Sequence, residues 1–389
     1  MLAIAGLLLV AAAAASLLPG DPALAAAEKP PLSIAEIQRA LDAPGAHDPF
    51  VPPTQLGLPG DLSRFIPEKN PLTRAKVELG RQLYFDKRLS KDGSVSCASC
   101  HHPSKGWTDC APVSSGIHGQ KGGRSAPTVL NRMFGTTQFW DGRAATLEEQ
   151  ALGPIGNPIE MGYSPDAAAE RLAGIQGYRI QFERIFGGPP TAAGIAMAIA
   201  AFERTVLSGA NANDYFEAAL PYHRIEPDED WTREDFERRD RALADERRHG
   251  LSEAGRRGRE LFFGKAECST CHVGANLTDE LFYNLGIGFD PAKPDPGREA
   301  VTGNPADRGA YKTPTLRNVA STAPYMHDGS LATLREVVEH YNKGGNPNPW
   351  LSSRIRKLGL TAAEVDDVVA FMNELGGTTP DAEEPRLPE

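Results

Sequence analysis

Two copies of the pattern C-x-x-C-H constrain this chain more than any other feature. The first begins at Cys97 and the second at Cys268, and together they use four of the five cysteines. Two cysteines three positions apart on a helical turn can form thioether bonds to the two vinyl groups of one porphyrin, and the histidine that follows can ligate its iron. The sequence therefore predicts two covalently attached c-type haems. Their attachment residues are Cys97, Cys100 and His101 for the first haem, and Cys268, Cys271 and His272 for the second.

Other chemistries share part of this pattern. A lone C-x-x-C is also found in redox dithiols and as half of a zinc site. Neither motif here has a second C-x-x-C or an H-x-x-x-H at the spacing of a zinc knuckle, and both end in histidine. Two such motifs in one exported chain favour haem attachment over both alternatives.

The first 25 residues indicate export. Residues 2–18 are apolar and uncharged, and Ala23-Leu24-Ala25 is a small-x-small cleavage site, so we expect residues 1–25 to be a signal peptide and the mature protein to be periplasmic. No Lys or Arg precedes the apolar run, which departs from the usual pattern. An uncleaved anchor is the alternative, because the run approaches the roughly 20 residues of a membrane span. No other run approaches that length, which predicts no membrane span after processing.

The net charge and the fifth cysteine indicate which partners the protein could have. The 389 residues carry a formal charge of −10, and the mature chain, which loses only Asp21, carries −9. An acidic surface argues against nucleic acid and anionic lipid as partners and permits docking of a basic electron-transfer protein. The fifth cysteine, Cys110, could pair between chains in a homodimer. We prefer to interpret it as a free thiol, buried and without a redox role.

An internal duplication surrounds the haem motifs. Gly-Arg-Gln-Leu-Tyr-Phe at 80–85 precedes the first motif and Gly-Arg-Glu-Leu-Phe-Phe at 258–263 precedes the second, each at the end of a helical stretch. Apolar periodicity predicts further helices, and no strand pattern of any length competes. We therefore expect a mainly α fold with two cytochrome c-like haem domains and long loops. The further helices are expected near residues 166–172, 178–186, 192–207, 334–341 and 362–375.

The expected domains follow this duplication. Residues 26–60 and 379–389 are rich in Pro and in acidic or small residues, and they predict an N-terminal arm and a flexible tail. Between them we expect one haem domain at 61–240 and a second haem domain at 241–378. The segment 227–248 is densely charged, which predicts a solvated helix or a connector between the domains.

Three further motifs carry a resemblance to a known family. They are Q-F-W-D-G-R at 138–143, G-P-I-G-N-P-I-E-M-G at 153–162 and P-Y-M-H-D-G at 324–329. The residues and the order of these motifs resemble those of bacterial dihaem cytochrome c peroxidases and the related MauG proteins. The similarity runs from about Pro71 to Gly376.

The resemblance implies that the first haem is the peroxide site. Gln150, Pro154 and Glu160 match the residues that lie over its open face in the family. Cleavage of the O–O bond needs a group that takes a proton from one oxygen and returns it to the other, and one carboxyl group can do both. Trp140 resembles the tryptophan between the two haems, while Trp107 is interpreted as packing.

The sixth ligand of the second haem separates the subgroups of this family. In the peroxidase subgroup a methionine lies 14 residues after the histidine that matches His327. This chain has Tyr341 at that position, which resembles the axial tyrosine of MauG. Met326 falls at the wrong place in the motif. Thioether ligation favours ferrous iron, whereas a phenolate stabilises higher oxidation states. A tyrosine that packs on the porphyrin edge is the alternative.

Two smaller features are also implied. His118 resembles a loop histidine that caps the first iron in some oxidised peroxidases, and an ordinary loop histidine is the alternative. Thr322 and Pro324 match positions whose carbonyls hold a calcium ion between the haems, but Ser125 stands where the family has an asparagine. Calcium tolerates water ligands, so a calcium ion is still expected.

The resulting prediction is a periplasmic dihaem peroxidase. Hydrogen peroxide would react at the His101 haem, with electrons relayed through the second haem from a small cytochrome c or cupredoxin. One alternative is a MauG-like enzyme that oxidises side chains of a partner protein through a bis-Fe(IV) state. MauG uses a surface tryptophan just before its second haem motif, whereas this chain has Ala266-Glu267 there. The other alternative is a non-catalytic dihaem electron carrier, which would need neither Glu160 nor an open iron.

Overall fold

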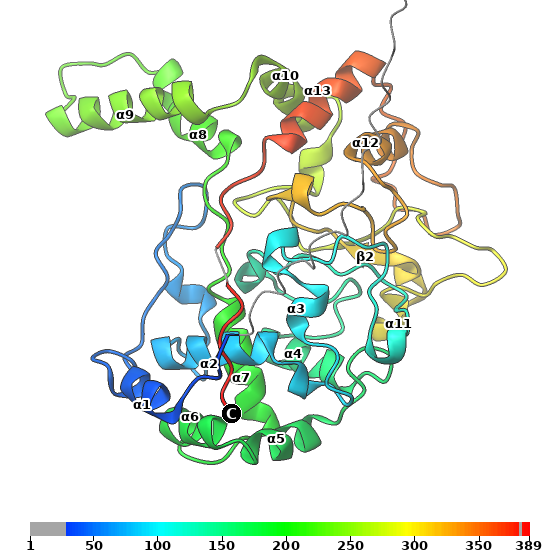
Figure 1. Ribbon diagram of the computed structural model, residues 1–389. Coiled ribbons are helices and arrows are strands. Elements are labelled where there is room, and N and C mark those ends of the chain that lie inside the picture. Colours follow the sequence, from blue (N-terminus) through cyan, green and yellow to red (C-terminus); the bar gives the residue numbers. More distant parts are fainter. Residues whose placement is uncertain (1–28, 381–382) are drawn as a thin grey trace, which may run out of the picture.

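The computed structural model describes residues 29–380 and 383–389, and the expected signal peptide lies outside the described residues. Within this part of the chain the fold is mainly helical, which confirms the predicted class (Figure 1). None of the described helices is long and apolar enough to cross a membrane. The α-helices are α1 (Ile34–Asp42), α2 (Arg74–Phe85), α3 (Cys97–Cys100), α4 (Leu147–Gly156), α5 (Pro165–Ala173), α6 (Gln176–Phe186), α7 (Ala192–Glu203), α8 (Ala212–Ala219), α9 (Arg233–His249), α10 (Glu253–Phe263), α11 (Glu299–Thr302), α12 (Leu334–Asn342) and α13 (Ala362–Asn373).

Helices α1 to α7 form what we call the first lobe. Its core lies where α2, α6 and α7 meet, and fully buried members include Leu79, Leu83 and Phe182. Trp107 is also fully buried, and its ring lies 5.9 Å from the ring of Tyr84. Trp107 therefore packs in this core, as the sequence predicted.

Helices α8 to α13 and a two-stranded antiparallel sheet form the second lobe, and all of these helices except α11 lie above the first lobe in Figure 1. Helix α10 crosses α13, and Phe262 and Phe371 meet there with ring centroids 5.1 Å apart. Strands β1 (Phe282–Asn284) and β2 (Ala310–Lys312) pair antiparallel, with Tyr283 opposite Tyr311. The side chain of Phe216 in α8 packs on this core, although the sequence assigned α8 to the first domain.

The duplicated glycines mark the same helix crossing in both lobes. A Cβ added at Gly80 of α2 would overlap the main-chain carbonyl of Ala198 in α7. A Cβ added at Gly258 of α10 would overlap the carbonyl of Asp367 in α13 in the same way. Each lobe thus brings the helix before its haem motif and its last helix so close that only glycine fits between the backbones. This is the physical reason for the repeated sequence before each haem motif.

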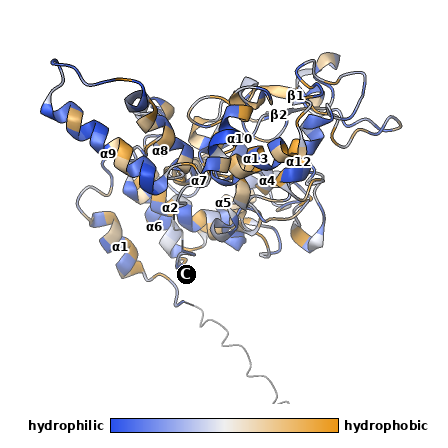
Figure 2. Cartoon of the chain, turned by 90° about the horizontal axis from the view of Figure 1, so that it is seen from above, coloured by the Kyte–Doolittle hydropathy of each residue, from blue (hydrophilic) through white to orange (hydrophobic). Residues whose placement is uncertain are grey.

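The densely charged segment forms α9, which projects from the body of the molecule. Figure 2 shows a mostly hydrophilic helix, and only Glu246 of it is buried. Its first turn is closed by a capping box in which Thr232 and Asp235 satisfy each other's backbone N–H groups. The prediction of a solvated helix is confirmed.

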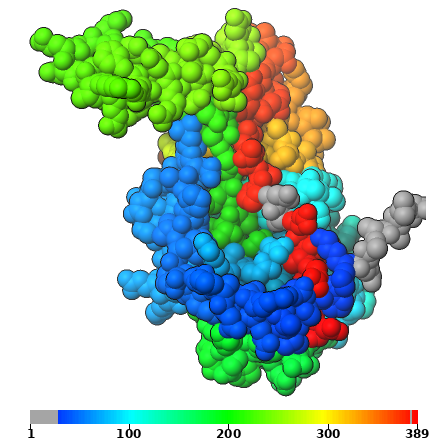
Figure 3. Space-filling view, turned by 60° about the vertical axis from the view of Figure 1, so that its left-hand side comes forward, coloured from blue at the N-terminus to red at the C-terminus, as the bar shows by residue number. Residues whose placement is uncertain are grey.

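The two ends of the described chain differ from the expected arm and flexible tail. The arm contains α1, which packs on α6. Residues 383–389 run back along the first lobe, where Leu32 forms a bridge with Pro388 and Arg386 donates 2.8 and 3.0 Å hydrogen bonds to Glu36. Figure 3 shows these two ends of the chain in contact. The partners lie about 350 residues apart, so the polar composition of the tail could not reveal this contact.

Candidate active site

One cavity of about 610 Å³ extends along both lobes and receives both C-x-x-C-H motifs. The four cysteines are unpaired. Burial raises the pKa of Cys100 to about 11 and the pKa of Cys268 to about 12, so these thiols are neutral at pH 7. The residues that the sequence predicts to attach the haems all line its wall: Cys97, Cys100, His101, Cys268, Cys271 and His272.

Local backbone geometry presents each histidine to this cavity. The first motif is the short helix α3, and the amide of His101 closes its last turn on the carbonyl of Cys97 at 2.9 Å. The second motif is a 3₁₀ turn, and the amide of His272 closes on the carbonyl of Cys268 at the same distance. Both histidines therefore sit directly beyond a turn that carries two thiols on one side.

The ring of His272 is held in the neutral form, and in the tautomer, that can bind a metal ion. Its Nδ1 lies 3.0 Å from the carbonyl oxygen of Leu277, and a carbonyl can only accept a hydrogen bond, so Nδ1 carries the proton. Burial lowers the pKa of His272, which keeps the ring neutral. The remaining nitrogen, Nε2, then carries a free lone pair, which is the form that binds iron.

His101 is also neutral, but within the described chain it lacks the hydrogen bond that fixes the tautomer of His272. Burial lowers the pKa of this histidine as well, and its Nδ1 is buried without a hydrogen-bond partner among the described residues. The hydroxyl of Tyr84 donates a 2.7 Å hydrogen bond to the carbonyl of His101 and fixes the backbone behind the ring. Neutral imidazoles, unpaired thiols in pairs and a shared cavity fit two c-type haems.

Glu160 lies in the wall of this cavity, in the turn after α4. Its Oε1 accepts a 2.9 Å hydrogen bond from Nδ2 of Asn157. Burial raises the pKa of Glu160, and Arg143 and the hydrogen bond from Asn157 oppose that rise. Gln150 and Pro154 of α4 line the same cavity. The structure thus brings together the three residues that the resemblance assigned to the peroxide site.

Trp140 also lines the cavity and is half-buried. Its Nε1 donates a 2.8 Å hydrogen bond to the carbonyl of Ser125, and its own carbonyl accepts a 2.8 Å bond from the amide of Lys312 in the second lobe. The segment that carries the indole is therefore attached to both lobes.

Tyr341 of α12 faces the cavity near the second haem motif. Burial raises the pKa of its phenol, and Cys268 and Cys271 add to that rise. His340 beside it lies with Nε2 3.0 Å from the carbonyl of Leu285, which fixes the end of α12. Met326 lines the cavity too.

Two predicted residues lie at the surface instead. The side chain of His118 is 67% exposed, and its Nδ1 lies 3.6 Å from the carboxylate of Asp92. Ile117 is buried and its amide bonds the carbonyl of Glu160, which turns the next residue outward. The structure does not bring His118 to the cavity. Cys110 is free within the chain but exposed, so the expected burial of its thiol is wrong.

Thr322 and Pro324, which are expected at a calcium ion, line the cavity, and so does Ser125, which stands where the family has an asparagine. The carbonyls of Thr322 and Pro324 accept no hydrogen bond from the residues that the structure describes. The carbonyl of Ser125 is occupied by the indole of Trp140. Two free carbonyls are oxygen donors of the kind that calcium prefers.

A second buried carboxyl group was not predicted from the sequence. Glu203 ends α7, lines the cavity and is only 5% exposed, and its Oε2 has no partner in the described chain. Burial raises its pKa to about 8, so this group holds a proton at neutral pH. A signal existed, because Glu203 follows the buried Ala196 and Ile199 on the apolar face of an otherwise apolar helix.

The helical lobes and the paired attachment sites define a di-haem protein of the cytochrome c type. A family model for "Di-haem cytochrome c peroxidase" matches residues 74–219, and a cytochrome c model matches residues 255–376. The chain is 40% identical to the methylamine utilization protein MauG of Methylorubrum extorquens, over 83% of this chain and 84% of that protein. It is 35% identical to the cytochrome-c peroxidase IdrP1 of Denitromonas iodatirespirans, over 83% and 87%.

Among solved structures, a MauG-like protein associated with microbial copper homeostasis matches with a TM-score of 0.69 and 33% identity, over 88% of this chain and 98% of that one. The chain therefore belongs to the di-haem cytochrome c peroxidase and MauG family, as its motifs predicted. It is an oxidoreductase of the peroxidase class with two c-type haems.

Proposed function

We propose that this protein reduces hydrogen peroxide to water at the haem attached to Cys97 and Cys100. Electrons would come from a small periplasmic c-type cytochrome or cupredoxin by way of the haem attached to Cys268 and Cys271. The observation that carries this proposal is Glu160, a carboxyl group with a raised pKa in the wall of the cavity that receives the first haem motif. A protein that only carries electrons needs no such group.

The residues supply proton transfer and orientation. When bound, the haem at His101 supplies an iron that accepts peroxide oxygen and exchanges electrons with it. Glu160 takes the proton from the oxygen that is to be retained and returns it to the oxygen that leaves as water. The amide of Gln150 donates a hydrogen bond that orients the peroxide. Two electrons and two protons then convert one hydrogen peroxide into two waters.

We assign the second centre to His272 and Tyr341. The neutral ring of His272 and the phenol of Tyr341 both face the cavity beside the second pair of cysteines. A phenolate ligand favours oxidised iron, so this centre would hold an oxidising equivalent as well as pass electrons. Trp140, attached to both lobes, is the aromatic group that we place on the route between the two centres.

Oxidation of a partner protein is less well supported. Ala266 is buried and Glu267 forms an ion pair with Arg356, and none of the four tryptophans of the chain stands directly before the second motif. The position at which MauG exposes a tryptophan therefore offers no equivalent group here. We accordingly place peroxide reduction first.

The remaining assignments complete the proposal. Calcium would bind the carbonyls of Thr322 and Pro324 with water as further ligands. The periplasmic location, the division into haem domains at 61–240 and 241–378, and a homodimer remain predictions. His118 is not included among the iron ligands, because its side chain lies at the surface beside Asp92.

A steady-state assay tests the proposed activity. The holoprotein is mixed with a reduced small cytochrome c, and oxidation of that donor is followed by absorbance after peroxide is added. We expect oxidation that depends on both the enzyme and peroxide, with two donors oxidised per peroxide. A holoprotein with two intact haems whose spectrum and donor oxidation do not respond to peroxide would overturn the proposal.

A further inference from the structure

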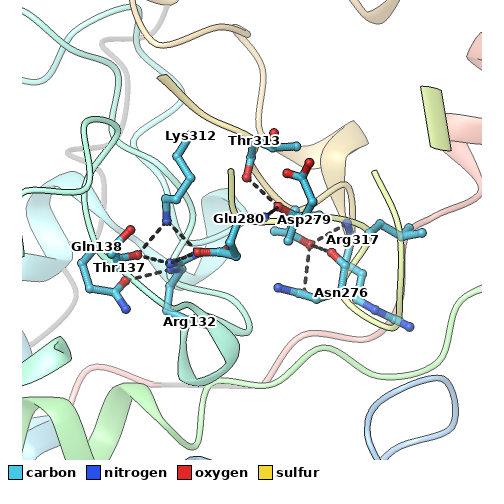
Figure 4. Close-up of polar contacts among 12 residues, drawn as sticks. Arg132, Thr137, Gln138, Asn276, Asp279, Glu280, Lys312, Thr313 and Arg317 are labelled. Atoms are coloured by element: carbon cyan, nitrogen blue, oxygen red, sulfur yellow. Dashed lines mark hydrogen bonds and ion pairs between the residues drawn. The ribbon is translucent and has the colours of Figure 1, made fainter. Parts of the chain in front are cut away.

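A group of three buried charges holds the segment that leads to Trp140. Figure 4 shows Arg132 of the first lobe and Lys312 of the second lobe converging on Glu280. Arg132 donates from Nη1 to Glu280 at 2.9 Å, and Lys312 donates from Nζ to Glu280 at 3.2 Å. The three side chains are 12%, 8% and 7% exposed for Arg132, Glu280 and Lys312, so the group is shielded from water.

Both cations also bind the main chain just before the tryptophan. The carbonyl of Thr137 accepts a 2.8 Å bond from Nη2 of Arg132 and a 2.9 Å bond from Nζ of Lys312. Nε of Arg132 donates to Oε1 of Gln138 at 3.0 Å. Glu280 thus orients Arg132 and Lys312, and each of these cations also donates a hydrogen bond to the segment 137–138.

The backbone at Trp140 itself is held on both sides. Its carbonyl accepts the amide of Lys312, and its indole N–H is bound to the carbonyl of Ser125. Phe139 between these contacts has a φ of 66°, a left-handed conformation that a bulky residue adopts only when its surroundings enforce it. Contacts to Thr137, Gln138 and Trp140 supply that enforcement.

We propose that Lys312 and Glu280 are positioning residues that fix Trp140 for electron exchange between the two haem centres. The inference rests on the proposed role of Trp140 and adds the residues through which the second lobe controls it. The mechanism uses neither side chain for proton transfer. Arg132 and Lys312 line the same cavity as both haem motifs, so the group borders the space between the two centres.

The electrostatics give this arrangement a pH dependence. Arg132 and Glu280 are the charged groups that bear on the amine of Lys312. Burial and the charge of Arg132 lower the pKa of Lys312 to about 7, and Glu280 opposes that shift. As pH rises through about 7, Lys312 loses its charge and with it the ion pair to Glu280. The contacts through which Lys312 fixes residues 137–140 then weaken.

The test measures electron exchange directly. The second haem of the holoprotein is reduced, a limiting amount of peroxide is mixed in by stopped flow, and reoxidation of that haem is followed by absorbance. Lys312→Met keeps the volume but removes both side-chain bonds. We expect it to slow reoxidation about tenfold or more, since displacement of a reacting group by about 1 Å can cost on the order of 100-fold. Lys265→Met removes an exposed lysine paired with Glu364 and should react at the parental rate.

Two more variants separate positioning from other failures. Lys312→Arg keeps its charge at every pH. It should retain most of the parental rate, and its rate should not fall above pH 7 as the parental rate does. Trp140→Phe tests the underlying function. If Trp140→Phe is slow and Lys312→Met reacts at the parental rate, the positioning role is wrong while the function stands. If Trp140→Phe is as fast as the parent, the route through Trp140 fails, and the positioning role with it. If Lys312→Met does not accumulate with both haems, the pH dependence of reoxidation in Lys312→Arg is the test instead. A pH dependence unchanged from the parent would overturn the inference.

Discussion

Replacement of Glu160 by glutamine tests the chemistry of the first centre most directly. The side chains have the same shape, and the amide oxygen of glutamine can still accept the hydrogen bond that Asn157 donates to Oε1 of Glu160. The change therefore removes proton transfer and leaves the wall of the cavity in place. Positioned acid–base groups contribute about 10²- to 10⁴-fold to a rate. At about 1.36 kcal/mol per factor of ten, this corresponds to about 2.7–5.4 kcal/mol of barrier.

The raised pKa of Glu160 adds a second expectation. The carboxylate must be ionised to take a proton, so the rate should fall as pH decreases through the pKa of Glu160, which burial places above the ordinary value for glutamate. Asn157→Ala removes a hydrogen bond that favours the ionised form, so the acid limb of the profile should move to higher pH. Glu160→Gln should abolish this limb.

The assay is the second-order rate of the first reaction with peroxide, measured by stopped-flow absorbance between pH 4 and pH 8. Glu170→Gln is the matched control, because Glu170 is exposed on α5, and it should keep the parental rate. A Glu160→Gln holoprotein that reacts within threefold of the parent would refute the assignment of Glu160. An acid limb that persists in that variant would show that another group, such as Glu203, moves the proton.

Three further predictions concern other parts of the molecule. Tyr341→Phe should convert the second haem from a six-coordinate to a five-coordinate spectrum, measured by electronic absorption and electron paramagnetic resonance, and an unchanged spectrum would exclude the phenol as ligand. Gly80→Ala should destabilise the protein by about 1–3 kcal/mol in urea unfolding because the new Cβ overlaps α7, whereas Gly60→Ala, with open space around it, should have almost no effect. Arg317→Met should cost about 3–5 kcal/mol in the same measurement, because it leaves Asp214 buried without its partner, and equal stability would contradict a buried ion pair.

The sequence by itself determined the cofactors and the main chemical groups. The spacing within each C-x-x-C-H motif places two thiols and an imidazole on one turn, and such local geometry needs no tertiary contact. Most of the longer helices were predictable for the same reason, since apolar residues recur at helical spacing, but α1, α4 and α8 were not predicted. The duplicated glycines also appeared in the sequence, although their role became clear only when each was found beneath a crossing helix.

Only the tertiary structure decided how these parts act together. Arg132 and Glu280 are 148 residues apart, and Lys312 lies 175 residues from the carbonyl of Thr137 that it binds. The contact between Arg386 and Glu36, the surface position of His118 and the buried carboxyl of Glu203 also depend on how distant segments pack. Periodicity and motif spacing report on neighbours along one helix or turn, so contacts of this separation follow only from the folded arrangement of the two lobes.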